Sequence, residues 1–389
     1  MTTILLSALL GCAPDAALRA EYDRQQAAAL AAPPLLRAEF VPDAVLTLSA
    51  PLVQRIVQGA LVDAAPITGD IAVGGGVVLT PKLRAVSATL KPSRACETCI
   101  AAVIALKGPL KFQGGILGRG QVPVRATARV DVAVAAVDRP QQWSITAQVR
   151  RVRDVELELS GVPDLVGQLA AEPVRAWAEQ TLTAQAPARL ASIRRDAVPV
   201  RALTVRPRGA AVQIALKTEA TEPGRIAQAN AKLDTDWRLE VSTQSLVSLG
   251  RTAAFRSGPQ TALQVVGTPE SLSVRRGGFT LGVRVWRLGG GGWWRDLDVE
   301  GTLGIADGYA QLTPTDAAQR DASPGASGPL AALTETFLPS AVAALLAQSA
   351  PASGSTTVGG TAVDVDVTRM LGAPAGDALQ LSGTLTLPR

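Results

Sequence analysis

The sequence predicts an α+β protein made of two tandem units, each a long curved antiparallel sheet wrapped on a long helix. Residues 37–218 and 236–388 repeat one order of elements: a strand, a short helix, a strand meander, a longer helix and two closing strands. Apolar and polar residues alternate over strands of about sixteen residues, well beyond the usual five or six. A repeat of whole units is stronger evidence of organisation than any single motif, and 389 residues are enough for two such units.

The N-terminus carries a short apolar run, residues 4–10, followed by Gly-Cys at Cys12. The run is too short to span a bilayer as a helix. It resembles a bacterial lipoprotein signal, and the resemblance implies cleavage before Cys12, diacylation of that cysteine and a membrane anchor. Ala13 follows the cysteine, which in that family favours the periplasmic face of the outer membrane. We expect a signal at 1–12 and a tether at 13–36, the alternative being a disordered apolar tail.

Each unit opens on an alternating strand that runs into a helix through a Ser or Thr residue, the type of residue preferred at a helix N-cap. The two openings read LTLSAPLVQRI from Leu46 and LEVSTQSLVSL from Leu239. They begin the two expected domains, 37–220 and 236–389.

Cys96 and Cys99 lie between two apolar strands, where the end of a hairpin is expected. In an oxidising periplasm the pair favours a small structural disulfide, and free thiols are the alternative. A redox centre would need Cys-x-x-Cys at the start of a helix, and a zinc site would need further Cys or His ligands.

The next two strands each have one apolar face, at the even positions of 121–136 and the odd positions of 143–159. We expect these faces to line an elongated apolar groove with a helix over 165–193, which Pro173 and Pro187 should kink or divide. A closed core is the alternative. The residues expected in the groove are Val122, Val124, Val130, Val132, Ile145 and Val149, with Arg151 and Arg153 at a bulge that aims them at anionic head groups.

A glycine-rich hairpin tip at 289–292 interrupts the second meander, in the sequence VWRLGGGGWWRD. Alternation places Trp286 and Trp294 on the face opposite the aliphatic one and Trp293 in phase with the core. Tryptophan favours the boundary between water and lipid, and Arg287 and Arg295 are suited to phosphates. We expect this tip to contact a membrane or a partner, the alternative being a cap on the core or a cross-strand pair.

Composition excludes several classes of function. The chain has no histidine, which removes His-based triads, His metal sites and imidazole general bases. Asp364 and Asp366 share a strand face in a pattern typical of a solvated edge. The formal charge of +5 comes without a compact basic stretch that carries aromatic residues, so nucleic acid is not an expected partner. We expect no catalytic residue, no metal and no cofactor.

The tandem order of short helix, long antiparallel meander, longer helix and returning strands resembles the tubular lipid-binding superfamily typified by the bactericidal/permeability-increasing protein. The resemblance covers residues 37–389 and rests on architecture, without a diagnostic motif. It implies sheets wrapped on long helices with a lipid in the seam, in a periplasm-facing lipoprotein that binds or transfers a lipid or a lipopolysaccharide-like amphiphile. The alternative is a non-catalytic β-rich envelope scaffold or assembly protein.

Overall fold

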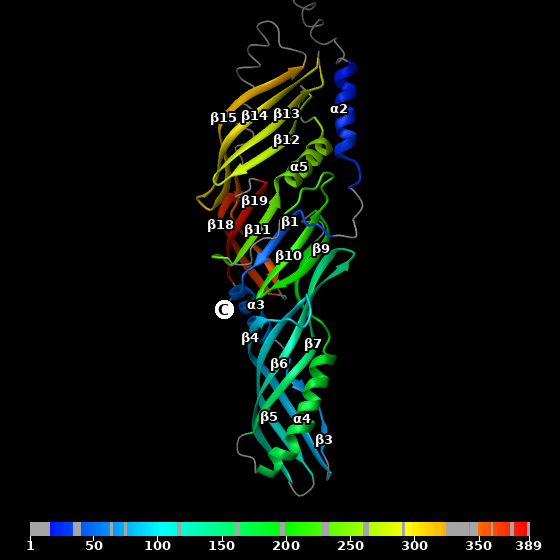
Figure 1. The fold of residues 1–389 in the computed structure, drawn as a ribbon, viewed down its shortest axis with the longest axis vertical. Helices are drawn as coiled ribbons and strands as arrows, with labels where there is room; N and C mark the ends of the chain where they lie inside the picture. The colour runs from blue at the N-terminus through cyan, green and yellow to red at the C-terminus, as the bar shows by residue number, and fades with distance from the viewer. Residues whose placement is uncertain are drawn as a thin grey trace, which may run out of the picture.

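The computed structural model shows an elongated molecule with curved sheets arranged along its long axis (Figure 1). The described part of the chain has four helices and nineteen strands, which form a 14-stranded and a 5-stranded sheet. The structure describes residues 16–33, 40–62, 65–73, 76–114, 118–159, 164–194, 199–226, 233–259, 264–289, 292–323, 342, 349–358, 361–373 and 377–386.

Both halves of the chain contribute to the sheet in the middle of the molecule. Its strands are β1 (Ala44–Leu48), β9 (Val200–Arg208), β10 (Ala211–Thr218), β11 (Trp237–Ser242), β18 (Thr361–Gly372) and β19 (Ala378–Thr386). β1 pairs antiparallel with β10 on one side and with β11, the first strand of the second half, on the other. β9 extends the sheet beyond β10, and β19 and β18 extend it beyond β11. The two halves therefore share one hydrogen-bonded sheet.

The first-half meander is a strongly curved antiparallel sheet. Its strands are β2 (Ile67–Thr68), β3 (Ile71–Val73), β4 (Val77–Pro92), β5 (Cys99–Gln113), β6 (Arg119–Arg139), β7 (Gln142–Leu159) and β8 (Ala188–Arg194). β6 has 21 residues and β7 has 18, so the prediction of unusually long strands is confirmed. β8 pairs in turn with β17 (Ser353–Val358), which joins this meander to β18.

Two helices pack on the first-half meander. α3 (Ala50–Val62) follows β1 and contacts β4, while α4 (Asp164–Ala184) contacts β7 and β3. α4 is about 32 Å long at 1.5 Å per residue. The helix predicted over 165–193 is wrong at its C-terminal end, because residues 188–194 pair with β7 as strand β8. Pro187 stands between the two elements and lacks the N–H that a helix interior requires.

The 5-stranded sheet forms the other end of the molecule. It comprises β12 (Val265–Arg275), β13 (Gly278–Arg287), β14 (Trp293–Ala306), β15 (Tyr309–Ser323) and β16 (Ser349–Pro351). α5 (Thr243–Ser257) packs against β12. The longer helix expected in the second unit falls in residues 330–348, which lie outside the described residues apart from Val342. The α+β class with long curved antiparallel sheets is confirmed, whereas the tandem duplication stays a prediction.

The segment 13–36, expected to be a tether, contains helix α2 (Ala16–Ala29), which is docked beside α5 and β13 (Figure 1). Tyr22 is 2% exposed, and its ring meets those of Phe255 and Trp286 edge to face at centroid distances of 5.3 and 5.5 Å. The prediction of a tether is therefore wrong for α2, since aromatic side chains from the second half bury one face of this helix.

A buried carboxylate fastens the shared sheet to α5. Asp43, directly before β1, is 0% exposed. It accepts hydrogen bonds from the Thr218 N–H at 2.8 Å and the Thr218 hydroxyl at 2.7 Å, at the end of β10. It also accepts one from the Ser245 hydroxyl, in the first turn of α5, at 3.2 Å. The three donors satisfy the buried charge and hold the start of β1, the end of β10 and the start of α5 together.

Candidate functional site

An apolar cavity of about 970 Å³ lies between the first-half meander and the central sheet. Its walls are the inward faces of these sheets, so most of the lining residues recur at every second position of a strand. This is clear along β5, with Ile100, Ala102, Ile104 and Leu106, and along β10 on the facing wall, with Val212, Ile214 and Leu216. The cavity is thus the space left where two aliphatic sheet faces curve apart.

Helices α3 and α4 complete the lining. Val53, Ile56 and Val57 of α3 face the cavity, and Leu182 contributes from the end of α4. Sequence reasoning assigned no role to the three α3 residues, although their spacing of three and four residues is typical of one apolar helix face. This spacing could have predicted that the three α3 residues lie on one apolar face of the helix and line the cavity.

On a neighbouring face of α3, two glutamine side chains bind the backbone of β4. The Gln54 amide donates to Ala88 O, and its carbonyl accepts from the Leu90 N–H at 2.9 Å. One turn later, Gln58 donates to Val86 O at 2.9 Å and accepts from the Ala88 N–H at 3.1 Å. The two amides reproduce the alternating donors and acceptors of a strand, and they hold α3 as a wall of the cavity.

The predicted groove residues divide into two groups. Val132, Ile145 and Val149 line the cavity. Val122, Val124 and Val130 belong instead to packed clusters that include residues of α4. Val130 is only 1% exposed. The cavity therefore lies toward the end of the meander next to the central sheet, while Val122, Val124 and Val130 on the same apolar face are packed against other side chains.

The predicted bulge is present, because the register of β6 with β7 shifts on both sides of Val130 and Asp131. The predicted aim of Arg153 at a head group is wrong. Its guanidinium makes two hydrogen bonds of 2.7 Å to the Asp131 carboxylate, on the face opposite the cavity. These bonds stabilise the charged carboxylate and lower the pKa of Asp131, although burial acts to raise it. Arg153 therefore neutralises a buried carboxylate.

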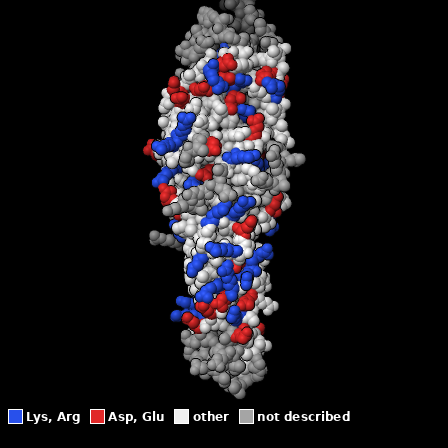
Figure 2. Space-filling view, in the orientation of Figure 1, with Lys and Arg blue, Asp and Glu red and all other residues white. Residues whose placement is uncertain are grey.

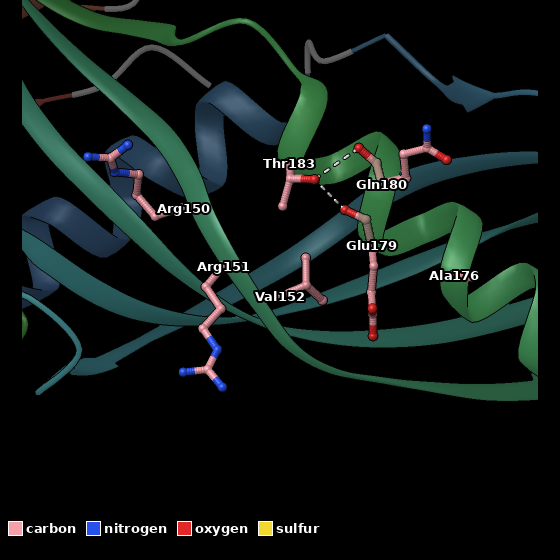
Figure 3. Close-up of a pocket in the computed structure, with 7 residues that line it drawn as sticks. All are labelled: Arg150, Arg151, Val152, Ala176, Glu179, Gln180 and Thr183. Atoms are coloured by element: carbon pink, nitrogen blue, oxygen red, sulfur yellow. Dashed lines mark hydrogen bonds between the residues drawn. The ribbon is translucent and has the colours of Figure 1, made fainter.

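Arg151 is also absent from the described lining of the apolar cavity. With Arg150 it borders a separate hollow of about 430 Å³ between β7 and α4 (Figure 3). Figure 3 shows both guanidinium groups pointing away from α4, which contributes Glu179 and Thr183 to the other side. The predicted role of Arg151 in the groove is not supported by this placement.

The β13–β14 hairpin forms as predicted, but Trp286 does not face outward. It is 0% exposed beneath α2, and its indole N–H donates to the Thr268 hydroxyl at 3.2 Å. Trp286 and Trp294 are cross-strand partners, and the Arg284 guanidinium lies 4.1 Å from a ring centroid of Trp294. The prediction of a membrane contact is wrong for Trp286, because α2 covers this face of the sheet.

The other residues of the tip are also engaged with the protein. Trp293 packs against the core of the second half, in phase as predicted. Arg295 is 4% exposed, donates to Trp294 O at 2.8 Å and lies 5.1 Å from the Trp293 ring centroid. Arg287 is half-buried. Burial of Arg295 contradicts its predicted role at a membrane surface.

Cys96 and Cys99 form a disulfide at the β4–β5 hairpin, as predicted, with Cys96 in the loop and Cys99 at the first residue of β5. Cys12, the predicted site of acylation, lies outside the described residues. Among the residues that the structure describes, no group of acidic or cysteine side chains is arranged to hold a metal ion. None of the described helices is both long enough and apolar enough to cross a membrane.

The outer face of the first-half meander carries paired charges. Arg129 on β6 forms ion pairs with Asp154 at 2.9 Å and Glu156 at 2.8 Å, both on β7. Figure 2 shows basic and acidic side chains interleaved along the molecule. This face differs sharply from the aliphatic inner face that lines the cavity.

No protein-family model and no curated protein matches the chain. Among solved structures, a lipopolysaccharide binding protein is 14% identical, with 90% of this chain and 100% of that chain covered and a TM-score of 0.36. P47 of Clostridium botulinum E1 is 8% identical, with 89% and 99% covered and a TM-score of 0.47. P47 from Clostridium botulinum A2 is 9% identical, with 88% and 97% covered and a TM-score of 0.39. Because each of these three TM-scores is below 0.5, they carry no argument for the function, which rests on the cavity and, for the anchor, on the sequence around Cys12.

Proposed function

We propose that this protein is a non-enzymatic envelope lipoprotein that holds or transfers a lipid or lipopolysaccharide-like amphiphile in the apolar cavity. The observation that carries the proposal is the cavity itself, about 970 Å³ with walls made mostly of Val, Leu, Ile and Ala. Its volume lies at the upper end of the range for small-molecule sites, roughly 300–1,000 Å³. An acyl chain fits such walls, because each buried methylene contributes about 0.8 kcal/mol.

A purely structural role accounts less well for this space. Packed protein interiors contain few voids larger than a water molecule. Apolar walls left in contact with water are unfavourable by about 25 cal/mol per Å² of apolar surface. An apolar occupant covers these walls, whereas a scaffold would fill the same faces with its own side chains.

The anchor and the location belong to the same proposal. Gly11-Cys12 after a short apolar run supports acylation, and two acyl chains hold a protein stably at a membrane where one does not. The protein would then sit on the periplasmic face of the outer membrane. Its cavity would take up an amphiphile there without any catalytic step.

Native mass spectrometry of the protein extracted from its own membranes tests the proposal, because a bound lipid adds a defined mass. Ala147→Trp places an indole in the cavity, and it should lower the bound fraction while the protein stays folded. Ala135→Trp is the matched control, since Ala135 is exposed on the outer face of β6. A wild-type protein without lipid, together with unchanged uptake of a fluorescent fatty acid by Ala147→Trp, would instead support the scaffold.

A further inference from the structure

Helix α2 runs antiparallel to α5 and is fixed to it at several points. At the C-terminal end of α2, the Ala29 carbonyl accepts a hydrogen bond from the Thr252 hydroxyl at 2.9 Å. Earlier in the helix, the Gln26 amide donates to Phe255 O at 3.3 Å, and the Tyr22 ring packs on the ring of Phe255. Contacts closer to the start of α2 are therefore made with residues closer to the end of α5.

The start of α2 points away from the central sheet. α5 is attached to that sheet at its own start, because Ser245 in its first turn donates to Asp43 directly before β1. The end of α5 thus lies further from the central sheet, against β12, and α2 continues in the same direction toward its first residue. Leu18 in the first turn of α2 belongs to the cluster around Trp286. Figure 1 shows the start of α2 at the end of the molecule opposite the first-half meander.

The chain between Cys12 and α2 is short. Cys12 precedes Ala16, the first residue of α2, by four residues, and four fully extended residues span at most about 14 Å. From Ala16 to Ala29 the helix itself extends about 20 Å at 1.5 Å per residue. The reach of the cysteine is shorter than the docked helix, so Cys12 cannot return to the level at which Ala29 meets Thr252. An anchor on Cys12 is confined to the far end of the second half.

The cavity and the first-half meander lie in the other direction along the molecule. Leu46 and Leu48 of β1 are part of the cavity wall, and the central sheet stands between α2 and the meander (Figure 1). β5 leads further away from α2. Its residue Ile100 packs with strands of the central sheet, and Gln113 at its other end follows about 40 Å of strand later. The far tip of the meander is therefore remote from the start of α2.

We propose that the end of the second half at the start of α2 is the surface that faces the anchoring membrane, and that the protein stands upright on this membrane. The partner of this surface is the phospholipid leaflet that holds the acyl chains of Cys12. The cavity and the first-half meander are then held in the periplasm, away from that leaflet. This inference rests on the anchor in the proposed function. It adds a fixed orientation, which a flexible tether over residues 13–36 would not impose.

Energy transfer from one fluorophore to rhodamine-labelled lipids tests the orientation, with the acylated full chain on vesicles of phosphatidylethanolamine and phosphatidylglycerol. Arg256→Cys places the fluorophore in the last turn of α5, and Gln113→Cys places it at the far tip of the meander. Both residues are exposed. Cys12 is acylated in this protein and the other two cysteines form the disulfide, so only the introduced thiol reacts with a maleimide dye. Transfer should be severalfold higher from Arg256→Cys than from Gln113→Cys.

The matched control inserts about twenty Gly and Ser residues between Cys12 and Ala16, which gives the anchor a root-mean-square reach of about 25 Å. This variant should stay on the vesicles, and transfer from the two positions should become similar. Equal transfer without the insertion, or higher transfer from Gln113→Cys, would overturn the orientation. A difference that survives the insertion would overturn it too, because the short reach would not be its cause. A protein that carries no diacyl mass would show that the anchor itself is wrong, whereas lipid in the cavity is tested separately by native mass spectrometry.

Discussion

Replacing Asp43 with alanine should lower the free energy of unfolding by about 3 to 6 kcal/mol. The carboxylate is completely buried and accepts from the Thr218 N–H, the Thr218 hydroxyl and the Ser245 hydroxyl. Each buried donor left without an acceptor costs about 1–3 kcal/mol, and the lower half of that range applies here because the hydroxyl groups can rotate. The loss should appear as a lower urea midpoint when unfolding is followed by tryptophan fluorescence.

Asp43→Asn separates the hydrogen bonds from the charge. Its amide oxygen can accept from the Thr218 N–H while its NH₂ donates to the rotated hydroxyls, so this variant should lose clearly less stability than Asp43→Ala. Asp23→Ala is the surface control, because Asp23 is 53% exposed in its ion pair with Arg19, and it should change stability by less than about 0.5 kcal/mol. If Asp43→Ala and Asp23→Ala lower the free energy of unfolding by the same amount, the hydrogen bonds that Asp43 accepts from β10 and α5 do not stabilise the fold.

Three further outcomes are expected. Cys12→Ala should move the protein from the membrane to the soluble fraction and abolish incorporation of labelled palmitate, and retention of the variant in membranes would contradict the anchor. Arg153 lowers the pKa of Asp131 below the ordinary value of 3.8, so their pairing stabilises the fold above that value and this contribution is lost as pH falls through the lowered pKa. Arg153 is the largest cause of the lowered pKa, so the stability difference between wild type and Arg153→Ala should be greatest above pH 3.8 and should shrink as pH falls through the lowered pKa of Asp131, in unfolding curves between about pH 2 and pH 6. Tyr22→Ala should release α2 from Trp286, which would increase hydrogen exchange in α2 and shift tryptophan emission to the red; unchanged protection of α2 would show that Tyr22 does not hold the helix.

The local patterns of the sequence were sufficient for the first-half meander. Alternation over 121–136 and 143–159 corresponds to β6 and β7, and the disulfide of Cys96 and Cys99 lies in the expected hairpin. The same alternation could not distinguish a cavity from a closed core. An apolar face looks identical in sequence whether the facing wall touches it, as at Val130, or stands away from it, as at Val132.

The failures of sequence reasoning come from long-range contacts. Alternation correctly placed Trp286 on the face opposite the aliphatic one, but it could not show that residues from the N-terminal segment cover that face. The spacing of Leu18 and Tyr22, one helical turn apart, was a weak sign of a docked helix within a segment rich in Ala and Gln. The sequence also could not show that Arg153 pairs with Asp131, because this contact depends on the register between β6 and β7.

The glutamine contacts of α3 have a consequence for the behaviour of the protein at high concentration. β2 and β3 pair only with β4 residues before 84, so the later part of β4 has no strand neighbour on that side in the described structure. An exposed strand edge of this length is a template for edge-to-edge aggregation. Gln54 and Gln58 occupy three successive even positions of that edge with side chains, which offer no backbone for another strand to extend. α3 therefore also protects the free edge of β4 from pairing with another molecule. This protection is lost whenever the helix separates from β4.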